Sequence, residues 1–196
     1  DATVWQVMGT GLDHVDLDYL ASCGFTVTHC PGTLSAVAMA EAAILFMLMI
    51  SRFRNEAINV FERSGMSKPV GVNLEGKVLG LVGFGSSAQA LAIRALAFGM
   101  RVFAVDVRDI EAEVLDLTNP EFMGKPEDLD YVVGESDFLS IHLHLNNSTR
   151  HIINGRRLSL MKPTASLINV ARGALVDEKA LYESLLSGAI WGAGLD

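Results

Sequence analysis

The feature that most constrains this chain is a glycine-rich turn between an apolar strand and a helix. Residues 77–83 form a β-type run that is almost entirely apolar, and the turn Gly83-Phe84-Gly85-Ser86-Ser87-Ala88 leads into a helical pattern over residues 88–98. A near-continuous apolar strand is typical of a parallel sheet covered on both faces. The arrangement therefore predicts βαβ units built around that sheet.

The spacing within this turn matches a dinucleotide-binding fingerprint. The first glycine permits the tight bend, the second lets a pyrophosphate approach the backbone, and the third position needs a small residue where helix meets strand. Gly83 and Gly85 fill the first two positions, and Ala88 fills the third with one extra methyl. Helix N-terminal amides would face the phosphates, and the hydroxyls of Ser86 and Ser87 could add hydrogen bonds. A turn without a ligand is the alternative for the motif taken alone.

The alternation of strands and helices continues to the end of the chain. Further strands are expected at residues 101–106, 138–142, 166–170 and 189–195. The least regular strand pattern lies near Phe122, where Asn119-Pro120 and Lys125-Pro126 interrupt it. The predicted fold class is therefore α/β, a Rossmann doubly wound parallel sheet.

The first 32 residues are organised differently. Strand-like runs at 1–8 and 25–30 enclose a turn at residues 9–11 and a helical pattern at 15–23. So short a piece cannot bury a core of its own, so we expect 1–32 to be the remnant of a second, substrate-binding domain. Residues 33–196 would form the dinucleotide-binding domain, with a linking helix over 34–53.

Charge and composition narrow the possible partners. The chain carries 15 Lys and Arg against 23 Asp and Glu, a net charge of −8, which does not suit a nucleic-acid binder. Cys23 and Cys30 lie in no metal-ligand pattern, so we expect a reduced cytoplasmic protein without a metal. An organellar location behind a removed leader stays open. The apolar stretch 34–50 contains Glu41, so we expect a helix covered by the second domain or a partner subunit, and no membrane span.

Two charged residues follow predicted strands. Asp106 lies 23 residues after Gly83, where a carboxylate can accept hydrogen bonds from ribose hydroxyls and repel a 2′-phosphate. This favours NAD over NADP, with Arg108 as the reservation because a nearby cation can hold that phosphate. Arg172 follows the strand at 166–170 and offers a planar donor set that matches a carboxylate. A solvated aspartate and an ion-paired surface arginine are the alternatives.

Together these residues resemble the D-isomer-specific 2-hydroxyacid dehydrogenase family. The resemblance covers nearly the whole chain, through the stretches GTGLDHVD, HCPGTLSAVAMAE, LEGKVLGLVGFGSSAQALA, SDFLSIHLHLNNSTRHIIN, INVARGALVDEKAL and GAGLD. It implies a phosphoglycerate dehydrogenase-like NAD-binding domain, commonly in a dimer. It also implies hydride transfer between NAD(H) and a D-2-hydroxy acid or 2-keto acid. A nucleotide-sensing, corepressor-like module without turnover is the alternative, and which 2-hydroxy acid would be the substrate stays open.

The resemblance also implies roles for single residues. Arg172 would bind the substrate and polarise its carbonyl, and the backbone of Gly9, Thr10 and Gly11 would receive the substrate carboxylate. The implied cofactor residues are Gly83, Gly85, Ser86, Ser87, Asp106, His142, Thr149, Ala171 and Asp196. The family's histidine base and its glutamate lie beyond the GAGLD stretch, so this fragment is expected to be inactive by itself.

Two histidines follow a predicted strand near the cofactor crevice. His142 and His144 carry imidazoles, which titrate in the range useful for a base, and His144 stands where the family ordinarily has proline. His144 is therefore a possible substitute base, and its departure from the pattern puts the nicotinamide geometry in doubt. His14, His29 and His151 have no neighbour in the sequence that suggests chemistry.

Overall fold

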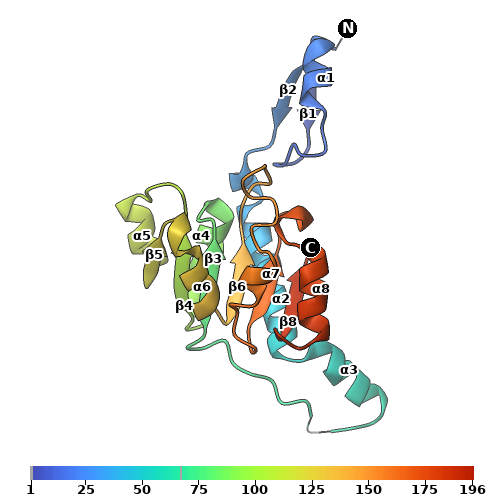
Figure 1. The fold of residues 1–196 in the computed structure, drawn as a ribbon, viewed down its shortest axis with the longest axis vertical. Coiled ribbons are helices and arrows are strands. Elements are labelled where there is room, and N and C mark those ends of the chain that lie inside the picture. The colour runs from blue at the N-terminus through green and yellow to red at the C-terminus, as the bar shows by residue number, and fades with distance from the viewer. Residues whose placement is uncertain (1, 67) are drawn as a thin grey trace.

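A six-stranded parallel sheet forms the centre of the molecule (Figure 1). The computed structural model describes residues 2–66 and 68–196. The strand order is β5-β4-β3-β6-β7-β8. The strands are β3 (Val78–Val82), β4 (Arg101–Val105), β5 (Phe122–Gly124), β6 (Phe138–Ile141), β7 (Ser166–Asn169) and β8 (Gly192–Leu195). The predicted α/β class is confirmed, and the irregular strand near Phe122 is the edge strand β5.

Helices cover both faces of this sheet, which explains its continuous apolar strands. In β3 successive side chains point to opposite faces. Leu79 and Leu81 pack with the helices α2 (Ala36–Ser51) and α4 (Ser86–Ala97). Val78 and Val82 pack with the helices on the other face, α6 (Leu129–Glu135), α7 (Gly155–Leu158) and α8 (Glu178–Leu186). Every residue of β3, β6 and β7 is buried.

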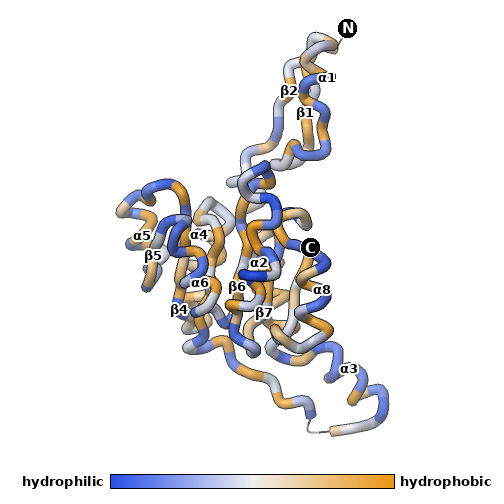
Figure 2. Tube along the Cα trace, viewed as in Figure 1, coloured by the Kyte–Doolittle hydropathy of each residue, from blue (hydrophilic) through white to orange (hydrophobic). Residues whose placement is uncertain are grey.

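Shorter elements complete the large unit. Helix α5 (Ala112–Thr118) follows β4 and contacts α4. Single 3-10 turns occur at Gly32–Leu34, Pro126–Asp128 and Gly173–Leu175. Asp177 caps α8, accepting a hydrogen bond from the Ala180 amide at 3.1 Å. The strands of the large sheet are predominantly hydrophobic in Figure 2, whereas the separate helix α3 (Arg54–Glu62) is largely hydrophilic.

The linking helix is shorter than the predicted span 34–53. Helix α2 ends at Ser51 because Phe53 adopts the left-handed conformation, with φ of 49°, and α3 begins after it. The sequence pattern did not predict α3. One side of α2 packs against this chain's own sheet and α4, through Ala40, Ala43 and Met47. From the sequence we expected cover by another domain or subunit and did not foresee this internal packing.

Part of the apolar stretch remains exposed. Leu34, Val37 and Leu45 lie on the surface. Within residues 2–66 and 68–196, no single helix is both long and apolar enough to cross a membrane. The helices α2 and α3 reach that length only as a pair, bent by 51°.

The N-terminal residues form a separate two-stranded parallel sheet. Its elements are β1 (Val4–Val7), α1 (Leu17–Ser22) and β2 (Thr26–His29), and Asp1 of the predicted strand 1–8 lies outside the described residues. Figure 1 shows this unit standing apart from the large sheet. Three of the four residues of β1 are exposed, and every residue of β2 is exposed or half-buried. Cys23 and Cys30 are free thiols.

Candidate functional site

The carboxyl ends of the six parallel strands meet at one edge of the sheet. From β3 the chain proceeds through α4 to β4 on one side, while β6 flanks β3 on the other side. The order of the strands therefore reverses between β3 and β6, and open α/β sheets bind their ligands in the crevice at such a point. Gly83 follows β3 and His142 follows β6. In Figure 1 this edge faces the N-terminal unit.

The glycine turn combines one strained position with one open position. Gly83 has φ of 88°, and a Cβ there would lie 2.7 Å from the carbonyl oxygen of His142, so only glycine fits. A Cβ on Gly85 would meet nothing within 4 Å among the described residues. The packing of the chain therefore does not require glycine at 85, and the space before its backbone is open. Ala88 is fully buried, so the sheet accommodates its extra methyl.

Helix α4 begins at this open space. The first amide groups of an α-helix lack an intrahelical acceptor and form its positive end. In α4 these groups belong to Ser86, Ser87 and Ala88, directly after the cap residue Gly85. The arrangement can hold an anion of the size of a phosphate in the space before Gly85.

Asp106 ties the end of β4 to the glycine turn. Its Oδ2 accepts a hydrogen bond from the Phe84 amide at 2.7 Å, and its Oδ1 accepts one from the Arg108 amide at 2.9 Å. Burial would raise the pKa of Asp106, but the hydrogen bonds from Arg108 and Phe84 outweigh it and hold the pKa at about 2. The side chain is only 7% exposed, so the alternative of a solvated aspartate is wrong.

Arg108 covers the same carboxylate. Its Nε donates to Oδ1 of Asp106 at 2.9 Å, and its Nη2 donates to Oδ2 at 3.0 Å. The Arg108 side chain remains 58% exposed, so solvent or a ligand can reach it. The strand end where a ribose was predicted thus carries a carboxylate and a cation side by side.

His142 joins the helix that follows the turn to β6. Its Nδ1 lies 2.9 Å from Oγ of Ser87, and its Nε2 lies 2.9 Å from Oγ of Ser140. Burial lowers the pKa of His142 to about 4, so the imidazole is neutral at physiological pH. So low a pKa does not suit a general base that works near neutral pH. No sequence pattern pointed to Ser140, which is a polar residue within a buried strand.

The loop after β6 holds Thr149 and His144. The Thr149 hydroxyl donates to the His144 carbonyl at 2.7 Å and accepts from the Asn146 amide at 2.9 Å. These contacts shape the loop itself. His144 is exposed, and the described contacts do not bring Thr149 to the glycine turn.

Asn169 shapes the turn that carries Arg172. Its Oδ1 accepts from the Ala171 amide at 3.1 Å, and its Nδ2 donates to the Arg172 carbonyl at 2.9 Å. Its own carbonyl accepts from the Asp196 amide at 3.1 Å, which places Asp196 beside the same turn. The sequence analysis missed Asn169, although a polar residue that ends a buried apolar strand was the available signal.

The Arg172 side chain reaches the N-terminal unit. Its Nε donates to Oδ1 of Asp13 at 2.7 Å, and a Cβ on Gly11 would overlap its Nη2. The loop of residues 9–11 therefore lies directly against the guanidinium. In that loop the Gly9 carbonyl accepts from the Cys30 amide at 3.0 Å, and the Thr10 side chain lies near Gly32. Arg172 thus forms an ion pair with Asp13, two residues after the predicted substrate loop 9–11.

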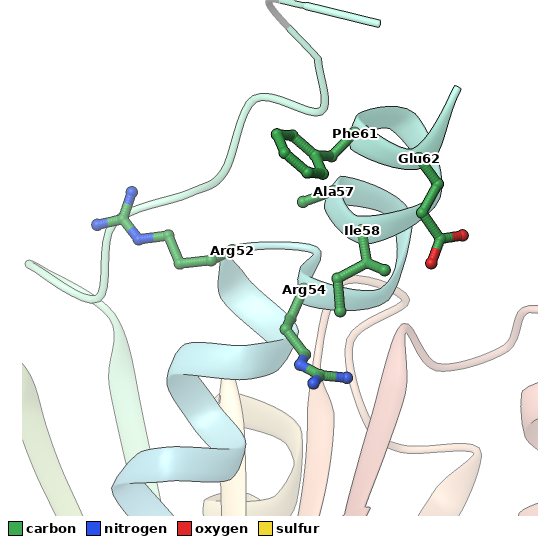
Figure 3. Close-up of a pocket in the computed structure, with 6 residues that line it drawn as sticks. All are labelled: Arg52, Arg54, Ala57, Ile58, Phe61 and Glu62. Atoms are coloured by element: carbon green, nitrogen blue, oxygen red, sulfur yellow. The ribbon is translucent and has the colours of Figure 1, made fainter. Parts of the chain in front are cut away.

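A surface hollow lies elsewhere, beside α3. Figure 3 shows Phe61 and Ala57 pointing from α3 into the space between α3 and the end of α2. This hollow lies at the end of the molecule away from the N-terminal unit (Figure 1). In the described part of the chain, no group of three or more His, Cys, Asp and Glu side chains could hold a metal ion.

Known proteins resemble the chain along almost its whole length. A family model described as "D-isomer specific 2-hydroxyacid dehydrogenase, NAD binding domain" matches residues 44–196. The chain is 40% identical over 190 residues to the hydroxypyruvate reductase of Thermotoga maritima, covering 96% of this chain and 59% of that protein. It is 41% identical over 197 residues to the glyoxylate reductase of Thermococcus litoralis, covering 95% of this chain and 57% of that protein.

A solved structure shows the same architecture. The D-lactate dehydrogenase of Aquifex aeolicus, complexed with NAD and lactic acid, superposes with a TM-score of 0.87 at 34% identity. The match covers 99% of this chain and 57% of that one. The chain thus spans somewhat more than half the length of each of these three relatives.

Proposed function

Because the chain belongs to the D-isomer-specific 2-hydroxyacid dehydrogenase family, we propose that it forms the cofactor-binding part of an NAD-dependent oxidoreductase. The observation that carries the proposal is the open space before Gly85, at the reversal point of the sheet and at the positive end of α4. The reaction is the interconversion of a D-2-hydroxy acid and its 2-keto acid. Residues 1–32 are the contribution of a second, substrate-binding domain, and 33–196 are the cofactor domain.

The residues at the carboxyl edge fit a dinucleotide. The amides of Ser86 and Ser87 and the open backbone of Gly85 would hold the pyrophosphate, and Gly83 keeps the turn tight. The Ser87 hydroxyl is engaged by His142, so its contribution to the phosphates comes from the amide. The positions predicted along the rest of the cofactor are Thr149, Ala171 and Asp196. When bound, the nicotinamide supplies or accepts the hydride.

Arg172 is the group proposed to act on the substrate. A guanidinium can bind the substrate carboxylate and stabilise the negative charge that develops on the carbonyl oxygen. The Gly9, Thr10 and Gly11 backbone lies against it, which supports a shared role in carboxylate binding. The names of the relatives support glyoxylate and hydroxypyruvate as substrates, and 3-phosphoglycerate belongs in the same panel. The proton would be handled by a histidine from the part of the relatives that this chain does not span.

Asp106 and Arg108 set the expected cofactor preference. We expect NAD, because the Asp106 carboxylate repels a 2′-phosphate and can exchange Arg108 donors for ribose hydroxyls. The exchange replaces hydrogen bonds with hydrogen bonds, because ribose hydroxyls would donate to the carboxylate oxygens to which Arg108 now donates. Arg108 is the group that would hold a 2′-phosphate if NADPH binds.

The test is calorimetric binding of NADH and NADPH to the full-length protein and two variants. We expect wild type to bind NADH at least tenfold more tightly than NADPH, and Asp106→Ala to narrow that preference. Arg108→Ala should weaken NADPH binding and leave NADH binding nearly unchanged. Equal affinity of wild type for both would refute the role of Asp106, and the absence of binding to either would refute the proposed function.

The surface hollow beside α3 supports the expected homodimer. Ile58 and Phe61 expose apolar surface beside Ala57, at 38% and 82% exposure for the two larger side chains (Figure 3). Apolar patches on a protein surface commonly mark contacts with another chain. We propose that a second copy of this protein, a cytoplasmic enzyme, covers this apolar surface. Sedimentation velocity should show a dimer that Phe61→Ser weakens, and a wild-type monomer at micromolar concentration would contradict it.

A further inference from the structure

One hydrogen bond joins the two units in the part of the chain that the structure describes. Among the residues described, the hydrogen bond from Arg172 Nε to Asp13 Oδ1 is the one side-chain or backbone hydrogen bond that links residues 2–30 to residues 36–196. Its length is 2.7 Å, and the two side chains are 38% and 32% exposed. Otherwise the backbone between Cys30 and Ala36 connects the units. This contact therefore decides where the guanidinium sits relative to the N-terminal loop.

The contact holds the guanidinium from one side. Asp13 accepts from Nε, and the Ala171 carbonyl accepts from Nη1 at 2.9 Å. A guanidinium has five N–H groups. The described residues accept from two of them, so both N–H groups of Nη2 and one of Nη1 remain for a ligand. Nη1 and Nη2 form the end of the guanidinium fork, which can bind a carboxylate through two parallel hydrogen bonds.

Gly11 leaves room for this arrangement. A Cβ on Gly11 would overlap Nη2 of Arg172. The absence of a side chain at 11 thus lets the free end of the guanidinium lie directly on the loop backbone. The hydrogen bond from Arg172 also lowers the pKa of Asp13 from its ordinary value, because it stabilises the charged carboxylate.

We propose that Asp13 is a positioning residue for Arg172: it fixes the guanidinium over the backbone of residues 9–11, so that cation and loop form one site for a substrate carboxylate. The inference rests on the proposed function of Arg172. Asp13 occupies only Nε in this arrangement, and the Ala171 carbonyl takes one N–H of Nη1, so both N–H groups of Nη2 and the second one of Nη1 are left for the substrate. An ion pair this exposed contributes little to folding, so its removal acts on the site and not on the fold. Small displacements of a positioned group are costly in catalysis.

The experiment compares Asp13→Ala, Asp13→Asn and Asp18→Asn in the full-length protein. Asp18 is an exposed acid in the first turn of α1 and serves as the matched control for loss of charge on the same unit. We expect Asp13→Ala to lower kcat/KM for glyoxylate or hydroxypyruvate at least tenfold, through both a higher KM and a lower kcat. NADH affinity and the circular dichroism spectrum should stay unchanged. Asp13→Asn should restore most of the activity, because its amide oxygen still accepts from Nε, and Asp18→Asn should behave as wild type.

A second variant reaches the same site without touching Asp13. Gly11→Ala should displace the guanidinium and cause a comparable loss. The double variant with Asp13→Ala should lose less than the product of the two single effects, because both changes disturb one group. If Asp13→Ala lowers KM instead, Asp13 competes with the substrate for Arg172, and the positioning role is wrong. The positioning role is equally wrong if the kinetics of Asp13→Ala match those of Asp18→Asn.

Arg172→Ala separates this inference from the function on which it rests. If Arg172→Ala abolishes turnover while Asp13→Ala leaves it intact, the proposed function stands and the positioning role falls. If Arg172→Ala retains full turnover, the proposed role of Arg172 itself is wrong.

Discussion

The large and the small sheet of this chain bury their strands to very different degrees. Every residue of β3, β6 and β7 is buried, and helices cover both faces of their sheet. In the small sheet Val4 and Trp5 of β1 are 57% and 48% exposed. The large unit thus encloses its strands between its own helices, whereas the small unit, which carries the 9–11 loop and Asp13, leaves most of β1 exposed.

The largest expected effect is the difference in unfolding free energy between two Leu→Ala substitutions, one in each unit. Leu167→Ala empties a fully buried position in β7, and such changes cost about 2 to 5 kcal/mol. Leu17→Ala removes the same atoms from a side chain of α1 that is 41% exposed, and it should cost about 0.5 kcal/mol or less. Denaturant unfolding of the chain measures both values.

The two tryptophans allow each unit to be followed separately. Trp5 lies in the small sheet against Phe25, and Trp191 lies beside Phe53 in the large unit. Fluorescence of variants that keep one tryptophan should show Leu167→Ala shifting the Trp191 transition strongly. Equal shifts for the two leucine variants would contradict the contrast between the units.

Acid should destabilise the large unit through His142. Its pKa is about 4 in the folded chain against an ordinary value of 6.5, so only the unfolded state binds a proton between these values. The free energy of unfolding should therefore fall as the pH drops from 6.5 to 4, by up to about 3 kcal/mol. Denaturant unfolding across this range measures the slope, and His142→Asn should flatten it. An unchanged slope in that variant would show that the imidazole does not carry the effect.

Asp106 acts in a separate, lower window. Its pKa of about 2 lies below the ordinary 3.8, so it stabilises the folded chain above pH 3.8. That contribution is lost as the pH falls toward 2. The slope of the unfolding free energy against pH therefore reports mainly on His142 between pH 6.5 and 4, and on Asp106 between pH 3.8 and 2.

The sequence predicted the large sheet well because its signal is local. The strand expected at 77–83 is β3 at Val78–Val82, since a buried strand needs only a short apolar run bounded by turn residues. The linking helix was predicted too long because no residue next to Phe53 signals its left-handed conformation.

The site was predictable only where its residues lie close in sequence. The glycine turn, Asp106 and Arg172 could be predicted because each directly follows a strand of a βαβ unit. The pairing of Arg172 with Asp13 does not, because the partners are 159 residues apart and an ion pair leaves no periodic pattern. The low pKa of His142 also escaped prediction, because burial at the end of a strand depends on how the neighbouring loop and helix pack over it.

The smallest expected difference in local cost between the two units comes from two helix caps of the same chemistry. Asp177 accepts from the Ala180 amide at the start of α8, and Asp16 accepts from the Tyr19 amide at the start of α1, at 3.1 and 2.9 Å. Replacing either by alanine should cost about 1 kcal/mol. Because α8 packs on the cooperative large core, Asp177→Ala should lower the free energy of unfolding reported by Trp191. Asp16→Ala should instead raise the amide exchange rates of α1 alone and leave the Trp191 transition in place. If Asp16→Ala shifts both transitions equally, the two units unfold together, and the contact between Asp13 and Arg172 couples them more strongly than its exposure suggests.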